Sequence, residues 1–325
     1  MQITTFLKTA ALTLPLLFGA ALAQTTVTIK HDEGTTVVPK NPKRVVVISE
    51  EMLDIAFALK LNVIGVGSPR ILPTDVTSAG KVNIKNLDKT FFQFGNIQNV
   101  TYVGNWMTPN METLLALKPD LIIRLYWQGL GEYQKLSQIA PTVSFSTDRP
   151  DGWKSAMTEL SKLGGKEARA KQFLNDYDRK VKAAKAQLQK AGVFKKYSKF
   201  MVICSFASGT DYLYTGNRVA NVMRSLGFTY NFPEGIKDDG GLVGVYALSK
   251  ETLLKVPADT LVISVPFTNG VEDTIASIKP SQDLLKQSKG HLVNYIYPAY
   301  SPWLGPNTDR QMVQDLTSAI LQSVK

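Results

Sequence analysis

A stretch without proline or glycine, Lys166 to Ala191, most constrains how this chain can fold. It predicts one helix of about 26 residues, which at 1.5 Å per residue is about 39 Å long. Its apolar residues recur every three or four positions, while lysine and arginine occupy the other faces. This stripe consists of Phe173, Tyr177, Val181, Ala184 and Leu188. We therefore expect a long amphipathic helix that packs along a single face.

A nine-residue pattern occurs once before and once after this helix. The first copy, residues 112–120, reads ETLLALKPD, and the second, residues 251–259, reads ETLLKVPAD. Each copy is followed by a short apolar run, so each predicts a helix that leads into a buried strand. Because Leu and Glu are common helix formers, five matching positions arise by chance as readily as by kinship. Both explanations stay open on this ground.

Residues 1–23 are predicted to be a signal peptide. Lys8 supplies a positive start, residues 12–22 an apolar core, and Ala21-Leu22-Ala23 a cleavage site of small residues. The segment is too short to span a bilayer. A buried N-terminal helix is the alternative, and the threonine-rich residues 24–28 that follow disfavour it. No Cys stands at the cleavage point, so we expect cleavage near Ala23, no lipid anchor there, and a periplasmic protein.

Charge and composition narrow the class of partner. The formal net charge is +10, and removal of Lys8 lowers it by one. An exported basic protein meets no nucleic acid, so an anionic small ligand or an anionic envelope surface is the expected partner. The single Cys204 excludes a disulfide within the chain and is expected to be an inert core thiol. His31 and His291, both expected at the surface, are too few for a zinc or manganese site built from histidines.

Strands alternate with helices throughout, which predicts α/β architecture. We expect an N-terminal α/β lobe over residues 24–150, a connecting helical segment over 151–192 and a C-terminal α/β lobe over 193–325. The β-branched runs 45–48 and 63–66 are typical of parallel strands buried on both faces. Residues 27–38 predict a β-hairpin.

Several local details are also predicted. Thr108 is a candidate N-cap for the first repeated helix, with Pro109 in its first turn, and Ser249 is a candidate N-cap for the second. Residues 212–218 are expected to form a loop, and His291 is placed in a basic loop. An amphipathic helix is predicted from about Asn307 to Val324.

The order of short motifs along the chain resembles a known family. The matching stretches are residues 42–47, 103–104, 109–112, 117–123, 139–143, 249–259, 284–290 and 303–305. In this order they resemble the substrate-binding proteins of iron-chelate and cobalamin ABC importers. The resemblance implies two Rossmann-like lobes joined by a single long α-helix, with a metal chelate bound between them.

The resemblance also implies partners. The expected partners are a ferric chelate and an ABC permease in the inner membrane, whose ATPase supplies the energy. In the family the first acid of each repeated helix docks on permease arginines, which here implies Glu112 and Glu251. The alternative is that each acid only complements the positive end of its own helix. We expect a monomer that has no cofactor or direct metal ligand of its own, because the ligand carries the Fe³⁺, and lobes held at nearly fixed separation.

The family's ligand loops lie at strand ends, where this chain offers arginines and aromatic residues. The candidates are Arg70, Trp106, Arg124, Tyr126, Trp127, Arg149, Tyr214, Arg218, Tyr300 and Trp303. Ferric catecholates and ferric citrate are anionic and rich in rings or oxygen, so guanidinium groups match their charge and aromatic faces match their rings. Packing at the rim is the alternative for any one of them. Trp106 stands where hydroxamate-binding relatives carry Arg, which disfavours a hydroxamate without excluding it.

Other functions remain open behind the ferric chelate. Haem is second, because a tyrosine such as Tyr126, Tyr214 or Tyr300 can ligate haem iron, and cobalamin is third. An exported hydrolase is the alternative from a different class. The chain has no Gly-x-Ser-x-Gly motif, and neither His has a recognisable nucleophile nearby in sequence. We therefore expect a binding protein and not an enzyme.

Overall fold

The computed structural model describes residues 25–85, 95–127, 131–146, 152–206, 210–236, 244–267, 279–295 and 305–324. Its first part contains β1 (Thr26–His31), β2 (Gly34–Pro39), β3 (Val45–Ile48), α1 (Glu50–Ala58), β4 (Val63–Gly67), a 3₁₀ turn (Pro73–Asp75), β5 (Thr101–Tyr102), α2 (Met111–Leu117), β6 (Leu121–Leu125), α3 (Tyr133–Ile139) and β7 (Thr142–Phe145). Then follow α4 (Gly152–Ser161), α5 (Glu167–Lys190) and α6 (Val193–Lys196). The last part contains β8 (Lys199–Phe206), β9 (Asp211–Tyr214), α7 (Arg218–Ser225), β10 (Thr229–Tyr230), β11 (Val245–Ala247), α8 (Lys250–Leu254), β12 (Thr260–Phe267), β13 (His291–Asn294) and α10 (Pro306–Ser323).

The first lobe is built on a parallel sheet with strand order β5-β4-β3-β6-β7. The central strand β3 is buried on both faces: Val45 and Val47 face one apolar cluster, and Val46 and Ile48 face another. This alternation explains the uninterrupted β-branched run, because each side chain enters a core whichever way it points. The strands predicted over 45–48 and 63–66 are confirmed. So is the hairpin, in which β1 pairs antiparallel with β2.

The second lobe contains a mixed sheet with the order β11-β9-β8-β12-β13, and β10 also pairs with β8. The predicted loop over 212–218 is wrong at both ends. Residues 211–214 form β9, which pairs antiparallel with β8 and β11, and Arg218 begins α7. The basic loop predicted around His291 is also wrong, because β13 pairs in parallel with β12 there. The strand β9 lies between β8 and β11, and β13 lies at the edge of the sheet beside β12, so both strands depend on pairing with other segments and not on their own residues alone.

The long helix is confirmed as α5, with 24 residues. Phe173, Tyr177, Ala184 and Leu188 of the predicted stripe are buried, and Val181 is half-buried against the same core. Glycines in the left-handed region lie just outside both ends, Gly165 with φ 65° and Gly192 with φ 73°. Such backbone angles favour glycine and interrupt a helix. Within the described residues, no helix combines the length and the apolar character that crossing a membrane requires.

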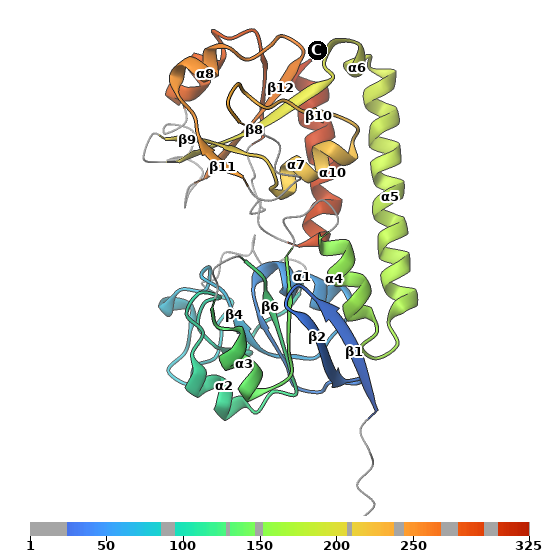
Figure 1. Ribbon diagram of the computed structural model, residues 1–325, viewed down its shortest axis with the longest axis vertical. Helices are drawn as coiled ribbons and strands as arrows, with labels where there is room; N and C mark the ends of the chain where they lie inside the picture. The colour runs from blue at the N-terminus through green and yellow to red at the C-terminus, as the bar shows by residue number, and fades with distance from the viewer. Residues whose placement is uncertain are drawn as a thin grey trace, which may run out of the picture.

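A second connection between the lobes involves α10, which packs along α5 and reaches the level of α1 (Figure 1). Asp54 on α1 accepts hydrogen bonds from the backbone N–H and the side-chain amide of Asn307, in the first turn of α10. The N-cap of α10 is Gly305, which has no side chain to cap the helix, so Asp54 performs this role from the other lobe. A Cβ on Gly305 would lie 2.3 Å from the Asp54 Cβ, so this close approach requires glycine.

The apolar core crosses from one lobe to the other. One continuous cluster runs from Ile29 in the hairpin through α4, α5 and α10 to the central strands of the second sheet. Between α4 and α5, the Trp153 ring lies edge-on to Tyr177 at 5.1 Å. The expected fold class, two α/β lobes joined by a long helix, is confirmed, and α10 adds a second helix along that connection.

Candidate functional site

Four of the candidate ligand residues gather at the carboxyl edge of the first sheet, where open α/β sheets place their ligands. Arg70 follows β4, Trp106 follows β5, and Tyr126 and Trp127 follow β6. The rings of Trp106 and Trp127 lie 5.5 Å apart, tilted by 38°. The strands β4 and β3 separate β5 from β6 in the sheet, so the two indoles meet across that edge. Trp127 is 50% exposed and offers its face to solvent.

A polar network supports this edge beside the tryptophans. Ser68 donates to the Glu50 carboxylate at 2.6 Å, and the Arg70 backbone N–H donates to the Ser68 hydroxyl oxygen at 2.9 Å. Burial raises the pKa of Glu50, although the Ser68 hydrogen bond and the Arg70 charge oppose the shift. Our sequence analysis did not single out Glu50 and Ser68. Their positions directly after β3 and β4, adjacent parallel strands, are the signal that would have found them.

The loop that carries Trp106 is fixed to the end of β4. The Ser68 N–H donates to the Gly104 carbonyl at 3.0 Å. Gly104 has a φ of 88°, and a Cβ there would lie 2.7 Å from the Thr108 carbonyl oxygen. Only glycine fits this turn, so the position of Trp106 follows from backbone geometry and not from its own side chain.

Arg124 does not lie on a strand-end loop. The strand β6 continues to Leu125, and Arg124 lies inside it with 2% of its surface exposed. Its guanidinium pairs with the Glu33 carboxylate at 3.4 Å, which ties β6 to the hairpin turn. A structural role therefore accounts for Arg124, and its contact with a ligand stays a prediction.

The two described candidates of the second lobe are also buried. Tyr214 ends β9, and burial, with the neighbouring Cys204, raises its pKa to about 12. Tyr214 is only 7% exposed, and its contact with a ligand stays a prediction. Arg218 is 1% exposed and donates from Nε to Asp309 at 2.8 Å. The Arg218 terminal nitrogens find no acceptor among the described residues.

The remaining predictions concern residues outside the described ranges, metal ligands and His31. Arg149, Tyr300 and Trp303, with the signal peptide, lie outside the described ranges, and their roles stay predictions. Among the described side chains, no three His, Cys, Asp or Glu are grouped to hold a metal ion. The expected surface position of His31 is wrong: it is 8% exposed, and its Nε2 shares a hydrogen bond with Thr36 Oγ1 at 2.8 Å.

The two repeated helices, α2 and α8, are capped in the same way. Asn110 accepts from the Thr113 N–H at 2.9 Å, and Ser249 accepts from the Thr252 N–H at 3.1 Å. Ser249 was the predicted cap. Thr108 was the wrong choice for α2, because the chain between Gly104 and Pro109 forms an isolated β-bridge and the helix begins at Met111. Both helices lie on the side of the molecule away from α5 (Figure 1).

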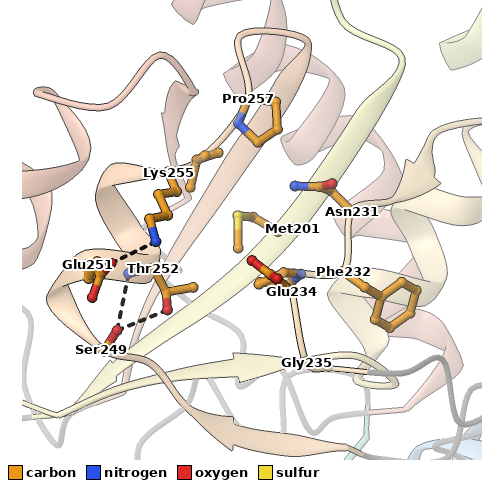
Figure 2. A pocket seen from close by; sticks show the side chains of 12 residues that line it. Met201, Asn231, Phe232, Glu234, Gly235, Ser249, Glu251, Thr252, Lys255 and Pro257 are labelled. Carbon is orange, nitrogen blue, oxygen red and sulfur yellow. Dashed lines mark hydrogen bonds and ion pairs between the residues drawn. The ribbon is translucent and has the colours of Figure 1, made fainter.

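The acids of these helices are both exposed, but their surroundings differ. Glu112 pairs with no cation in the described part of the chain. Glu251 is 75% exposed and pairs with Lys255 at 2.7 Å, and this hydrogen bond lowers the pKa of Glu251. Beside α8 lies a pocket of about 440 Å³ between the helix and residues 231–235. Figure 2 shows Lys255 and Thr252 on one side of it and Glu234 on the other.

Known proteins resemble this chain in sequence. The family model described as "Periplasmic binding protein" matches residues 45–290. The iron(3+)-hydroxamate-binding protein FhuD of Bacillus subtilis (strain 168) is 33% identical over 166 residues, which is 51% of this chain and 46% of FhuD. The Fe(3+)-citrate-binding protein YfmC of the same organism is 29% identical over 238 residues, 73% of this chain and 67% of YfmC. The chain thus spans about half the length of FhuD and of several other curated relatives that it matches.

A solved structure agrees with the same arrangement. Staphylococcus aureus SirA in complex with staphyloferrin B has a TM-score of 0.67 and 25% identity to this chain. The match covers 90% of this chain and 98% of SirA. The similarity therefore includes both lobes and the helix between them.

Proposed function

The chain belongs to the periplasmic binding protein family, and on this basis we propose that it captures an anionic ferric chelate and delivers it to an ABC permease. The chelate is of the siderophore or citrate type. Relatives support this class, because FhuD is named for iron(3+)-hydroxamate, YfmC for Fe(3+)-citrate, and SirA was solved with staphyloferrin B. The observation that carries the proposal is the Trp106–Trp127 pair on the sheet edge that also bears Arg70.

The chemistry of this edge suits a ferric chelate better than a bare ion. Two indoles at 5.5 Å offer apolar faces to the rings or chains of a chelator. Arg70 is only half-buried, so its guanidinium can meet a carboxylate or catecholate oxygen that carries the negative charge of the complex. The iron arrives already coordinated by the chelator, so the protein has to supply charge and shape and no metal ligand.

The proposal also includes what happens after capture. Glu112 and Glu251, one on each lobe, dock on arginines of the permease, and the chain itself turns over no substrate. Both acids are exposed on helices of the same side (Figure 1), which supports a single partner that contacts both. In this proposal the protein works in the periplasm as a monomer, without a lipid anchor.

A tryptophan-fluorescence titration tests the ligand class. The purified protein is titrated with ferric catecholate, ferric citrate, ferric hydroxamate, haem and cobalamin, and with each chelator free of iron as a control. We expect quenching at sub-micromolar concentration by one ferric chelate, and loss of most of it in Trp106→Phe and Trp127→Phe. Trp153, which is 3% exposed in the core, remains in both variants and reports whether their fold is unchanged. Tight binding of haem or cobalamin, or no binding at all, contradicts the proposal.

A further inference from the structure

The two repeated helices, α2 and α8, share an exposed leucine as well as an exposed acid. Leu115 follows Glu112 by three residues, and Leu254 follows Glu251 by three. Leu115 is 58% exposed and Leu254 is 43% exposed, although the leucines directly before them are almost completely buried. A single exposed leucine requires no explanation. The same leucine, exposed at the same position beside the same acid in both lobes, does require one.

The acid and the leucine of each pair share one helix face, because residues three apart on a helix are neighbours. In both helices the acid follows the N-cap residue by two positions, so the acid and the leucine occupy the same places relative to the start of the helix. The helices also lead into equivalent strands. The strand β6 after α2 pairs in parallel with β3, and the strand β12 after α8 pairs in parallel with β8. In sequence, β3 and β8 are the first strands of their sheets. Each lobe therefore presents a carboxylate next to an apolar side chain on corresponding surfaces.

We propose that Glu112 with Leu115, and Glu251 with Leu254, form two matched docking patches in which the leucines supply the apolar part of the contact with the permease. This inference rests on the proposed function and extends it. The chemistry of the patches selects a partner that carries, twice, a basic side chain beside an apolar hollow. Two equivalent patches therefore fit a permease made of two identical or closely similar halves. Desolvating a leucine next to an ion pair also excludes water from that pair and strengthens it.

Serine substitutions of the leucines provide the test. Leu115→Ser and Leu254→Ser are compared with wild type for binding to the permease–ATPase complex, purified together in lipid nanodiscs, by biolayer interferometry. The permease is the one whose deletion stops growth on the chelate that this protein binds. We expect each variant to bind at least tenfold more weakly, with unchanged affinity for the ferric chelate. Val37→Ser is the matched control, since Val37 is an apolar residue that is 60% exposed on β2, outside both helices.

The outcomes separate this inference from the function on which it rests. If both leucine variants bind the permease as Val37→Ser does, while Glu112→Ala and Glu251→Ala lose binding, the leucine patches are wrong and the proposed function stands. If the protein binds no ferric chelate, the proposed function fails whatever the leucines do. A dimer of wild type in size-exclusion chromatography that Leu115→Ser or Leu254→Ser dissociates would assign the patches to a second copy and overturn the inference. Thermal melting of every variant confirms that a loss of binding is not a loss of folding.

Discussion

The two repeated helices, α2 and α8, share their backbone design and differ in charge. In both lobes an Asn or Ser caps the helix, an acid lies in its first turn, and an aspartate follows eight residues after that acid. Both aspartates contact the start of the neighbouring strand, but through different groups. The Asp120 carboxylate accepts from the backbone N–H groups of Lys43 and Arg44 before β3, whereas the Asp259 carboxylate pairs with the Lys199 side chain at the start of β8. Among the four positions that differ, one changes the residue that lies one helical turn after the acid: Ala116 stands four residues after Glu112, whereas Lys255 stands four residues after Glu251.

The difference shows that a side-chain cap, the acid and the aspartate occur in both helices, whereas the charge one turn after the acid does not. Lys255 lies one helical turn after Glu251, so it partly neutralises the acid in the free protein. Glu112 keeps its full charge available. If the acids dock on the same kind of permease group, the first lobe offers the stronger electrostatic anchor and the second must exchange one ion pair for another.

Removing the acids tests this comparison with the largest expected effect. Glu112→Ala should weaken permease binding at least about tenfold, because truncating one member of a desolvated charge pair leaves its partner unpaired. Glu251→Ala should cost less, since the wild-type acid gives up Lys255 on docking. The measurement is permease affinity in nanodiscs, with ferric-chelate affinity as the check that capture is intact.

The exposed acid Asp283 provides a control for these variants. It pairs with Lys279 and Lys286 and belongs to neither α2 nor α8, so Asp283→Ala should dock as wild type does. An equal loss in Glu112→Ala and Glu251→Ala would mean that Lys255 does not compete for the docking acid. A greater loss in Glu251→Ala would reverse the order that we assign to the lobes.

Both patches can meet one permease only if the two lobes keep their relative position. Substitutions of Asp54, which joins α1 to α10, test this requirement. Asp54→Ala removes the acceptor that caps α10 from the other lobe, and loss of such a cap costs about 1 kcal/mol of stability. We expect a correspondingly lower melting temperature. Asp54→Asn retains an acceptor oxygen and serves as the matched variant.

The pH dependence of the same pair of variants has a defined sign. Burial raises the pKa of Asp54 from its ordinary value of 3.8 to about 6, against the opposing effects of its Asn307 hydrogen bonds and the Arg218 charge. A carboxyl whose pKa is higher in the folded state contributes stability below its unfolded pKa and loses it as the pH rises through the folded value. Asp54→Asn should therefore gain stability relative to wild type between about pH 4 and pH 6. The pKa of Asp309 is also raised to about 6, by burial and in part by the Asp54 charge, so Asp54→Asn removes that contribution as well and changes the stability in the same direction. A difference between the two proteins that stays flat with pH would contradict the raised pKa of Asp54.

Much of the fold was predictable because its signals are local. The stripe of α5, the buried runs of β3 and β4 and the cap at Ser249 each depend on residues within a few positions of one another. The strand β9 was missed because it lies between β8 and β11, and β11 comes much later in the chain, so the residues of β9 alone do not show that they form a strand. Thr108 and Asn110 are both residue types that cap helices, and the turn at Gly104, which no local pattern predicts, places the start of the helix after Asn110.

The sequence predicted the positions of site residues that follow the end of a strand. It did not predict which arginines are buried, because their burial depends on an acid that is distant in sequence. Trp106 and Trp127 follow strand ends, and the parallel sheet brings such ends together. Arg124 and Arg218 also follow apolar runs, but each finds an acid far away in sequence, Glu33 and Asp309 respectively. A charged side chain is tolerated in a core only when it is paired in this way, and no local pattern shows that the partner exists.

A charge exchange between the lobes gives the smallest effect and the sharpest test of their difference. Lys255→Ala frees Glu251 and should strengthen permease binding about twofold, whereas Ala116→Lys places a cation one turn after Glu112 and should weaken it by a similar factor. The effects are small because exposed ion pairs four residues apart on a helix are weak, and both should shrink at high salt. The double variant transfers the cation from one lobe to the other, so its affinity should return close to the wild-type value if the two patches contact equivalent permease sites. A double variant that differs from wild type by more than either single variant would mean that the two lobes meet different surfaces.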